Sequence, residues 1–165
     1  MKTITITKIV KGEGYVDIAP IEEPATVYTS KLDFHLDSSE AGDSEMQHLD
    51  YAYAASLIRT FMEDGSLVLT IRGRKYTPAA GFDFFVGKQL IGVSSVQTEV
   101  DAGYEGKEQI VLIEAKNSAT TNIIIRQLYY PFRQWREHTK KKIVTLFFEK
   151  EKRENVYNIW MFGIL

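Results

Sequence analysis

Asp101 and the tripeptide Glu114-Ala-Lys116 are the residues of this chain whose types and spacing point most directly to chemistry. Asp101 precedes a turn that contains glycine, and the apolar run Ile110–Ile113 leads from that turn into Glu114. This pattern predicts the two strands of a β-hairpin. Because side chains alternate between the two faces of a strand, Glu114 and Lys116 must point the same way.

The turn decides which residues of the two strands face each other. Centring it just after residue 107 places Asp101 opposite Glu114 and Glu99 opposite Lys116, and cross-strand partners share a face. One side of the hairpin then gathers three acids and one amine, which are costly to bury unless the acids bind a metal ion. A solvated strand end held by salt bridges, with Glu99 as the partner of Lys116, is the structural alternative.

These residue types suit phosphodiester hydrolysis with a divalent cation. Mg²⁺ prefers hard oxygen ligands and typically takes one or two carboxylates together with water and substrate phosphate. Asp101 and Glu114 can supply the carboxylates, and the backbone carbonyl of Ala115 can add a third ligand. Such a cation lowers the pKa of water and holds a phosphate oxygen, while Lys116 offsets the charge that develops there. The sequence therefore predicts a Mg²⁺ site, with Mn²⁺ able to substitute.

Two helices are expected to flank the hairpin in the sequence. The first should run from about residue 44 to residue 64, with Asp43 or Ser44 as its N-cap and Gly65 just after its last turn. The second is expected to open with residues 118–121. Pro131 should kink or split this second helix, because proline lacks a backbone N–H.

Short alternating or apolar segments predict the strands of a sheet. The order helix, strands, helix, strands predicts an α/β or α+β fold in which a mixed β-sheet is flanked by helices. Residues 43–165 would form this core, and residues 1–42 would form a β-rich N-terminal extension packed on it, within a single domain. The expected strands of the core cover residues 67–71, 82–86, 91–101, 109–116, 143–148 and 156–162.

With these elements the chain resembles the PD-(D/E)XK nuclease superfamily, in which an Asp precedes a hairpin turn and a Glu-X-Lys ends the next strand. Asp101 and Glu114-Ala-Lys116 are the matching residues, and Val100 stands where the name of the motif has Pro. Segments 113–117 and 124–133 resemble the type II restriction-endonuclease-like members of the superfamily, and the resemblance covers roughly residues 43–162. It implies a restriction-endonuclease-like core.

The resemblance also implies roles for residues on the two helices. Members of this superfamily often carry an acidic residue on the helix before the hairpin, where it assists metal binding. Glu45 is the candidate for that residue, and Asp50 is the second choice. Residues on the helix after the hairpin often hold the nucleic-acid phosphate or order the active site. The candidates on that helix are Arg126, Gln127, Tyr130 and Arg133.

A Mg²⁺-dependent endodeoxyribonuclease with DNA as its partner is the function that the resemblance implies. Paired cuts on a duplex favour a homodimer, because two-fold protein symmetry matches two-fold DNA geometry most simply. A structure-specific nuclease of the Holliday-junction resolvase type and a non-cleaving DNA-binding or interaction domain of the same fold are the alternatives. The expected catalytic residues are Asp101, Glu114, Lys116 and Glu45.

Composition limits the class of protein. The chain has 165 residues, of which 44% are hydrophobic and 25% are charged, as is usual for a soluble globular domain. It has no cysteine, which excludes disulfides and cysteine-ligated zinc. No run approaches the ~20 apolar residues of a membrane span, and the first residues lack the apolar core of a signal peptide. We therefore expect a cytoplasmic protein without a membrane partner.

Charge is distributed unevenly, although the net charge is only −2. Residues 31–65 hold eight acids and two bases, whereas residues 126–142 hold six bases and one acid. A basic segment of this kind favours contacts with phosphate. A solvated helix end, where lysines suit the helix dipole, explains the same segment equally well.

Overall fold

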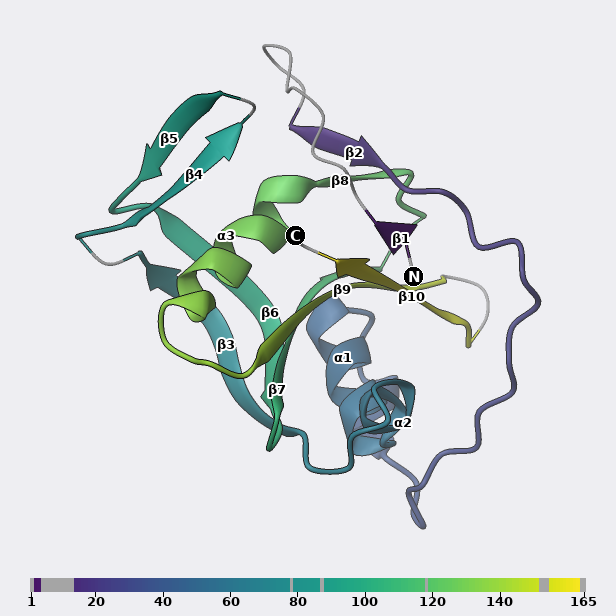
Figure 1. Cartoon of the computed structure of the whole chain (residues 1–165). Helices are drawn as coiled ribbons and strands as arrows, with labels where there is room; N and C mark the ends of the chain where they lie inside the picture. The colour runs from purple at the N-terminus through teal and green to yellow at the C-terminus, as the bar shows by residue number, and fades with distance from the viewer. Residues whose placement is uncertain are drawn as a thin grey trace.

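The computed structural model of the chain describes residues 2–3, 14–77, 79–86, 88–117, 119–151 and 155–163. Helices α1 (Glu45–Ala54) and α2 (Leu57–Phe61) lie on one face of a mixed β-sheet, and α3 (Ile125–Arg136) lies on the other (Figure 1). The expected α+β class, with a mixed sheet between helices, is therefore confirmed. In spatial order the strands are β1 (Lys2–Thr3), β10 (Tyr157–Gly163), β9 (Lys142–Lys150), β7 (Gln109–Lys116), β6 (Gln97–Glu105) and β3 (Val68–Tyr76).

The sheet combines antiparallel hairpins with a parallel pair that a helix connects. β6 pairs antiparallel with both β3 and β7, and β10 pairs antiparallel with β9. β7 and β9 are parallel, and α3 lies in the connection between them. Parallel neighbours need such a crossover, which carries the helix onto one face of the sheet. No helix among the described residues is long and apolar enough to span a membrane.

β7 is buried on both faces, which explains its unbroken apolar run. Ile113 packs in one cluster with Leu49 of α1, whereas Leu112 packs in another cluster against which Trp135 of α3 lies. Consecutive residues of β7 thus meet different helices. Because Glu114 shares the face of Leu112, it points toward the α3 side of the sheet.

A β-bulge interrupts the pairing of β6 with β3 next to Asp101. Ile71 of β3 pairs with Gly103, but Gly73 pairs with Val100, so β6 has one residue more than β3 between these pairs. The residues before and after Asp101 therefore pack on opposite faces of the sheet. A bulge of this kind changes the direction of a side chain and commonly occurs next to functional sites.

The helix expected over residues 44–64 is divided into α1 and α2. Ser44 is the N-cap, as one of the two predicted caps, and its Oγ accepts a hydrogen bond from the N–H of Gln47 (3.2 Å). The break lies at Ser56, which has a left-handed φ of 64°. The carbonyl of Ala55 accepts hydrogen bonds from the Tyr28 hydroxyl (2.7 Å) and from a backbone N–H at residue 31 (3.2 Å). The N-terminal segment thus donates to the carbonyl that would accept the N–H four residues later if the helix continued.

The ends of several other elements differ from the prediction. The expected strand over residues 91–101 is two strands, β5 (Gln89–Val93) and β6, because the chain turns at Ser95, where φ is 54°. β5 pairs with β4 (Phe82–Val86) in a separate two-stranded sheet beside α3 (Figure 1). Gly65 does not supply the left-handed residue after α2, because Glu63 does so with a φ of 52°.

α3 begins at Ile125, later than the opening expected at residues 118–121. Asn122–Ile124 instead form strand β8, which pairs with β2 (Tyr15–Asp17) of the N-terminal extension. The N–H of Ile125 donates to the carbonyl of Gly14 (3.2 Å), so backbone from the extension satisfies a donor at the start of the helix. Pro131 does not split α3, since it lies buried inside a continuous helix.

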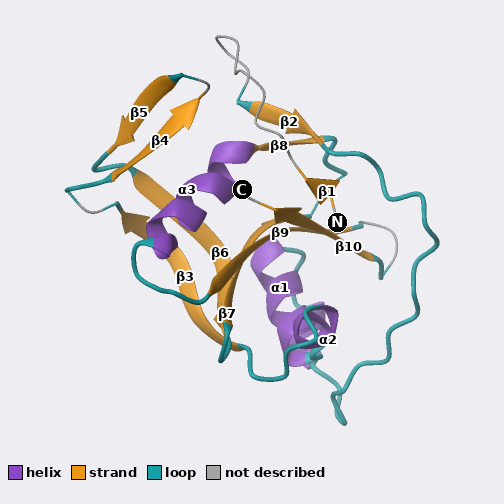
Figure 2. Cartoon of the chain, in the orientation of Figure 1, coloured by secondary structure: helices purple, strands orange, loops and turns teal. Residues whose placement is uncertain are grey.

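The described part of the N-terminal extension is mostly loop, which corrects the expectation of a β-rich segment (Figure 2). Between residues 14 and 42 it contains β2 and the 3-10 helix η1 (Asp37–Glu40), and its two prolines cannot donate to a strand ladder. The alternating residues 4–10 lie outside the described residues. The extension is bound to the sheet and to β8, for example through Trp160 Nε1, which donates to the carbonyl of Ala19 (3.2 Å).

Substitution of Gly103 by alanine should destabilise the chain, because β6 and β3 approach closely at this position. An added Cβ would lie 2.5 Å from Cβ of Ile71. We expect Gly103→Ala to lower the free energy of unfolding by about 1–3 kcal/mol, as other overpacked cores do, in urea denaturation. Gly65→Ala is the matched control, since its Cβ would meet nothing within 4 Å. Equal stability of the two variants would contradict this packing.

Candidate active site

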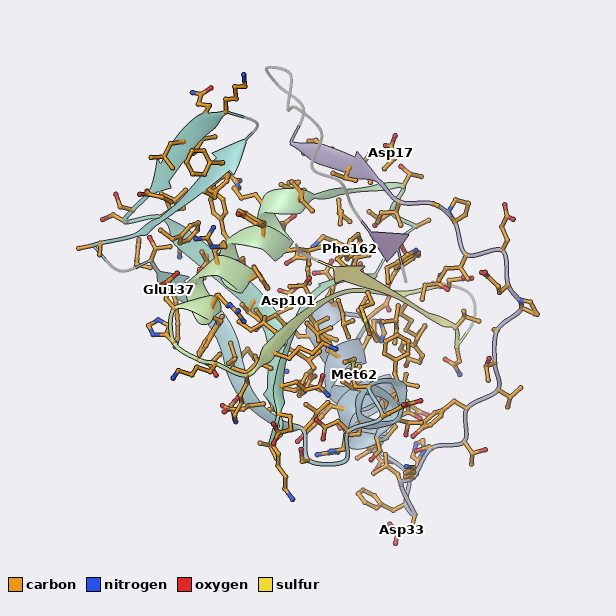
Figure 3. All side chains as sticks on the ribbon, viewed as in Figure 1. Asp17, Asp33, Met62, Asp101, Glu137 and Phe162 are labelled. Carbon is orange, nitrogen blue, oxygen red and sulfur yellow. The ribbon has the colours of Figure 1, made fainter. Side chains whose placement is uncertain are left out.

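The hairpin formed by β6 and β7 brings Asp101 and Glu114 together, as predicted. The observed pairs, from Ala102↔Ile113 to Glu105↔Ile110, have the register that a turn centred after residue 107 requires. At the end of this ladder, Asp101 Oδ2 accepts a hydrogen bond from the N–H of Ala115 (2.8 Å). The carboxylate of Asp101 is thereby fixed beside the backbone that carries Glu114. Asp101 lies on β6, whose faces are covered by α1 and α3 (Figure 3).

Lys116 shares the face of Glu114, as the alternation of the strand requires. Its Nζ donates to Glu114 Oε1 (2.6 Å) and to the carbonyl of Ala115 (2.9 Å). The expected pairing of Lys116 with Glu99 is wrong, because Arg74 Nε donates to Glu99 Oε2 (3.2 Å). Arg74 is the cross-strand neighbour of Glu99 on β3, so it reaches that carboxylate more directly.

Gln127 connects α3 with the acidic pair. Its Nε2 donates to Glu114 Oε1 at a distance of 2.5 Å. The same oxygen also accepts from Lys116. No described group donates to Glu114 Oε2 or to Asp101 Oδ1. Each carboxylate therefore keeps one oxygen without a hydrogen-bond partner within the described chain, and these two oxygens are hard ligands of the kind that Mg²⁺ binds.

Burial raises the pKa values of the two carboxyl groups, Glu114 and Asp101. The side chain of Glu114 is 7% exposed. Burial and the nearby charge of Asp101 raise the pKa of Glu114 to about 7, although Lys116 opposes this shift. Burial likewise raises the pKa of Asp101 against the opposing N–H of Ala115. Burial lowers the pKa of Lys116, but the hydrogen bond and charge of Glu114, together with Glu45 and Asp101, outweigh burial and raise it.

Glu45 reaches the site from the opposite face of the sheet. It is the first residue of α1, half-buried, and its charge acts on both Glu114 and Lys116. Asp50, the second choice, forms an ion pair with Arg72 of β3 instead. Of the two acids proposed for this helix, the structure therefore brings Glu45 to the hairpin.

The described side chains do not form a metal cage by themselves. No group of three or more His, Asp or Glu residues in the described ranges is arranged to hold an ion. Mg²⁺ does not need such a cage, because it usually keeps several waters and takes one or two carboxylates. Asp101 and Glu114 supply two carboxylates, which is the number that this open mode of binding uses.

The four residues proposed to contact nucleic acid are separated by the structure. Gln127 lies at the acidic pair, and Arg126 is exposed one residue earlier. Tyr130 instead contacts the ring of Phe82 on β4 edge-on, with 5.6 Å between ring centroids. Arg133 Nη2 donates to a backbone carbonyl of the same strand, at residue 83 (2.8 Å). Tyr130 and Arg133 therefore attach the β4–β5 hairpin to α3.

Two further residues near the site were not identified from the sequence. Asn117, directly after Lys116, donates from Nδ2 to the carbonyl of Asp43 (2.7 Å). Glu149 follows the strand expected over residues 143–148, but it lies buried in β9 in register with Lys116, and its Oε2 accepts from the N–H at residue 120 (3.0 Å). For Asn117 the signal was its position immediately after the motif. For Glu149 nothing local in the sequence indicated burial.

Comparison with known proteins yields a family but no activity. The sequence profile of a family described as "Domain of unknown function (DUF6997)" matches residues 10–164. None of the curated proteins and none of the solved structures matches the chain. The matched range includes residues 14–42 of the N-terminal extension together with helices α1–α3 and strands β3–β10.

The burial of Glu114 should make the stability of the metal-free chain depend on pH. Its pKa is 4.5 in ordinary surroundings and about 7 in the folded chain, so between these values the folded form holds a proton that the unfolded form has lost. The free energy of unfolding should therefore fall as the pH rises from about 4.5 to about 7. Urea denaturation across this range measures the effect.

Glu114→Gln should make this fall smaller, because an amide cannot ionise. Glu137→Gln, which changes an exposed acid just after α3, is the control and should leave the pH profile as it is in the wild type. An unchanged slope in Glu114→Gln would mean that Glu114 is not the group responsible.

Proposed function

The chain belongs to the DUF6997 family, and we propose that it is a Mg²⁺-dependent endonuclease that hydrolyses phosphodiester bonds of DNA. One observation carries this proposal. Asp101 and Glu114 converge at the end of a hairpin, each with an oxygen that accepts no hydrogen bond from the described residues, and Lys116 lies beside them. Two carboxylates can hold Mg²⁺ beside water and a phosphate, and an amine at the same point can offset the charge that develops in phosphodiester hydrolysis.

The order of elements around this point supports membership of the PD-(D/E)XK superfamily, with a restriction-endonuclease-like core. An acid precedes the hairpin turn, and the Glu-X-Lys ends the next strand. A helix with Glu45 in its first turn precedes the hairpin, and α3 follows it. This is the arrangement that the resemblance implies, and the proposal of an endonuclease rests on it together with the site.

Asp101 and Glu114 would hold Mg²⁺ through the oxygens that lack hydrogen-bond partners among the described groups, with the carbonyl of Ala115 as a further ligand. In this position the cation would acidify water and offset charge on the phosphate. Glu114 must be ionised to bind Mg²⁺, and the positive charge of the cation would compensate for the burial of the carboxylate. Mn²⁺ would fit the same oxygen ligands.

The remaining side chains would act on the substrate or hold the ligands. The ammonium group of Lys116 lies beside Glu114 and would stabilise negative charge that develops on the phosphate. Glu45 would support the cation through the attacking water, from which it would accept a hydrogen bond. Gln127 restrains Glu114 Oε1, which keeps the second oxygen of that carboxylate in one orientation. Paired cuts on a duplex would favour two copies of the chain related by two-fold symmetry.

Lys116→Ala should abolish cleavage while leaving DNA binding in place. Loss of one charge-stabilising group typically costs about 10²–10³ in rate, and we expect at least that loss in nicking of supercoiled plasmid with Mg²⁺. EDTA and the Asp101→Asn variant should have the same effect. Lys107→Ala, at the turn end of the same hairpin, is the matched control and should cut at the wild-type rate.

The same assay separates the proposal from its rivals. Preference for a four-way junction over linear duplex would assign a structure-specific nuclease of the Holliday-junction resolvase type. Binding of DNA by the wild type without any nicking in Mg²⁺ or Mn²⁺ would assign a non-cleaving domain. Undiminished cutting by Lys116→Ala would refute the role given to that residue.

Affinity for Mg²⁺ should increase with pH because Glu114 must lose its proton to bind. With a pKa of about 7, the ionised fraction of Glu114 rises about tenfold between pH 6 and pH 8. Calorimetric titration of Mg²⁺ should show the dissociation constant falling by a similar factor, with net proton release near pH 6. Glu114→Gln should bind weakly at both values. Equal affinity of the wild type at pH 6 and pH 8 would contradict Glu114 as a ligand.

A further inference from the structure

A hydrogen bond joins the two parts of the chain that carry the site. Asn117 follows Lys116 at the end of β7, and Asp43 lies two residues before Glu45. Asn117 Nδ2 donates to the backbone carbonyl of Asp43 with a distance of 2.7 Å. The two partners are 74 residues apart in the sequence, so this contact exists only because α1 packs against β7.

Asp43 is itself attached to α1. His48 Nε2 and Asp43 Oδ1 form a hydrogen bond of 2.7 Å, and the side chain of His48 is 10% exposed. The cap bond from the N–H of Gln47 to Ser44 Oγ closes the same turn. Movement of Asp43 would therefore carry the first turn of α1, and Glu45 with it.

The bond from Asn117 is poorly placed to contribute much stability. It lies at an exposed surface, where water competes for both partners, and such bonds contribute a net of only about 0.5–1.5 kcal/mol. The body of α1 is anchored one turn further on, where Leu49 and Ala52 are completely buried. What the Asn117 bond determines is the position of the first turn relative to the end of β7.

We propose that Asn117 is a positioning residue that clamps the first turn of α1 to β7 and so holds Glu45 in place toward Glu114 and Lys116. This inference rests on the proposed function, in which Glu114 holds the cation, Lys116 lies beside it and Glu45 supports the cation through the attacking water. Asn117 touches none of the reacting groups. Its effect passes through the carbonyl of Asp43, and the expected consequence of losing it is a looser cation site in a folded chain.

Asn117→Ala removes the clamp, and Asn158→Ala is the matched control. Asn158 also donates from Nδ2 to an acceptor (Glu151 Oε1, 3.0 Å), but it lies on β10. In metal-free protein we expect amide hydrogen exchange at Gln47 and His48 to be about 2–10-fold faster in Asn117→Ala, which corresponds to one hydrogen bond. The control should exchange at the wild-type rate there. Asn117→Gln keeps an amide donor and should recover part of the protection.

The second measurement is calorimetric titration with Mg²⁺. Loss of an outer-sphere partner of a metal ion typically weakens metal binding by about 10–100-fold. Glu45 would be such a partner through the water, so we expect a loss in this range for Asn117→Ala while its urea midpoint stays close to that of the control. Faster exchange with unchanged Mg²⁺ affinity would reduce the bond to a structural one and overturn the proposal. Unchanged exchange would overturn it as well.

The two proposals fail in different ways. A wild-type chain that neither binds Mg²⁺ nor nicks DNA would show that the proposed function is wrong. The exchange rates of metal-free wild type, Asn117→Ala and Asn158→Ala would then still decide whether Asn117 holds the first turn of α1.

Discussion

A carboxylate that is almost removed from water must be protonated or compensated, and Glu114 is in that position at the end of β7. Lys116 and Gln127 both donate to one of its oxygens, yet Asp101 adds like charge and the pKa of Glu114 still rises to about 7. The compensation within the chain is therefore incomplete. A divalent cation shared with Asp101 would complete it, which is the physical reason for proposing a cation site at this strand end.

The surrounding elements make this partly compensated charge persist. The bulge in β6 changes the direction of the strand at Asp101, and the Asp101 carboxylate takes the N–H of Ala115 where the β6–β7 ladder ends. α3 brings Gln127 from one face, and α1 brings Glu45 toward the site from the other. The N-terminal extension supports the site indirectly, through α3. The carbonyl of Gly14 accepts from the first backbone N–H of α3, and β2 pairs with β8, which leads into that helix. The range matched by the family profile includes residues 10–42 of this extension, among them β2 and Gly14, which make these contacts.

Sequence reasoning succeeded where the physical cause is local. Apolar residues on both faces identified β7 with its observed ends, and turn length alone predicted the register that joins Asp101 to Glu114. Residue type predicted Asp43 or Ser44 as the N-cap of α1, and Ser44 is the cap. Sequence reasoning failed where a distant segment supplies a backbone hydrogen-bond partner. Ala55 accepts from the extension at the break between α1 and α2, and Gly14 accepts from the first residue of α3. The end of α1 and the start of α3 therefore differ from the prediction.

The sequence by itself determined that Asp101, Glu114 and Lys116 lie at one end of a hairpin, because alternation along a strand and the length of a turn involve only neighbouring residues. Tertiary structure decided the rest of the site. It assigned Arg74 to Glu99, Gln127 to Glu114 and Asn117 to Asp43, and it turned Arg133 toward the β4–β5 hairpin. The reason is that a long polar side chain has several acceptors within reach, and only the packing of helices against the two faces of the sheet selects which of them is near.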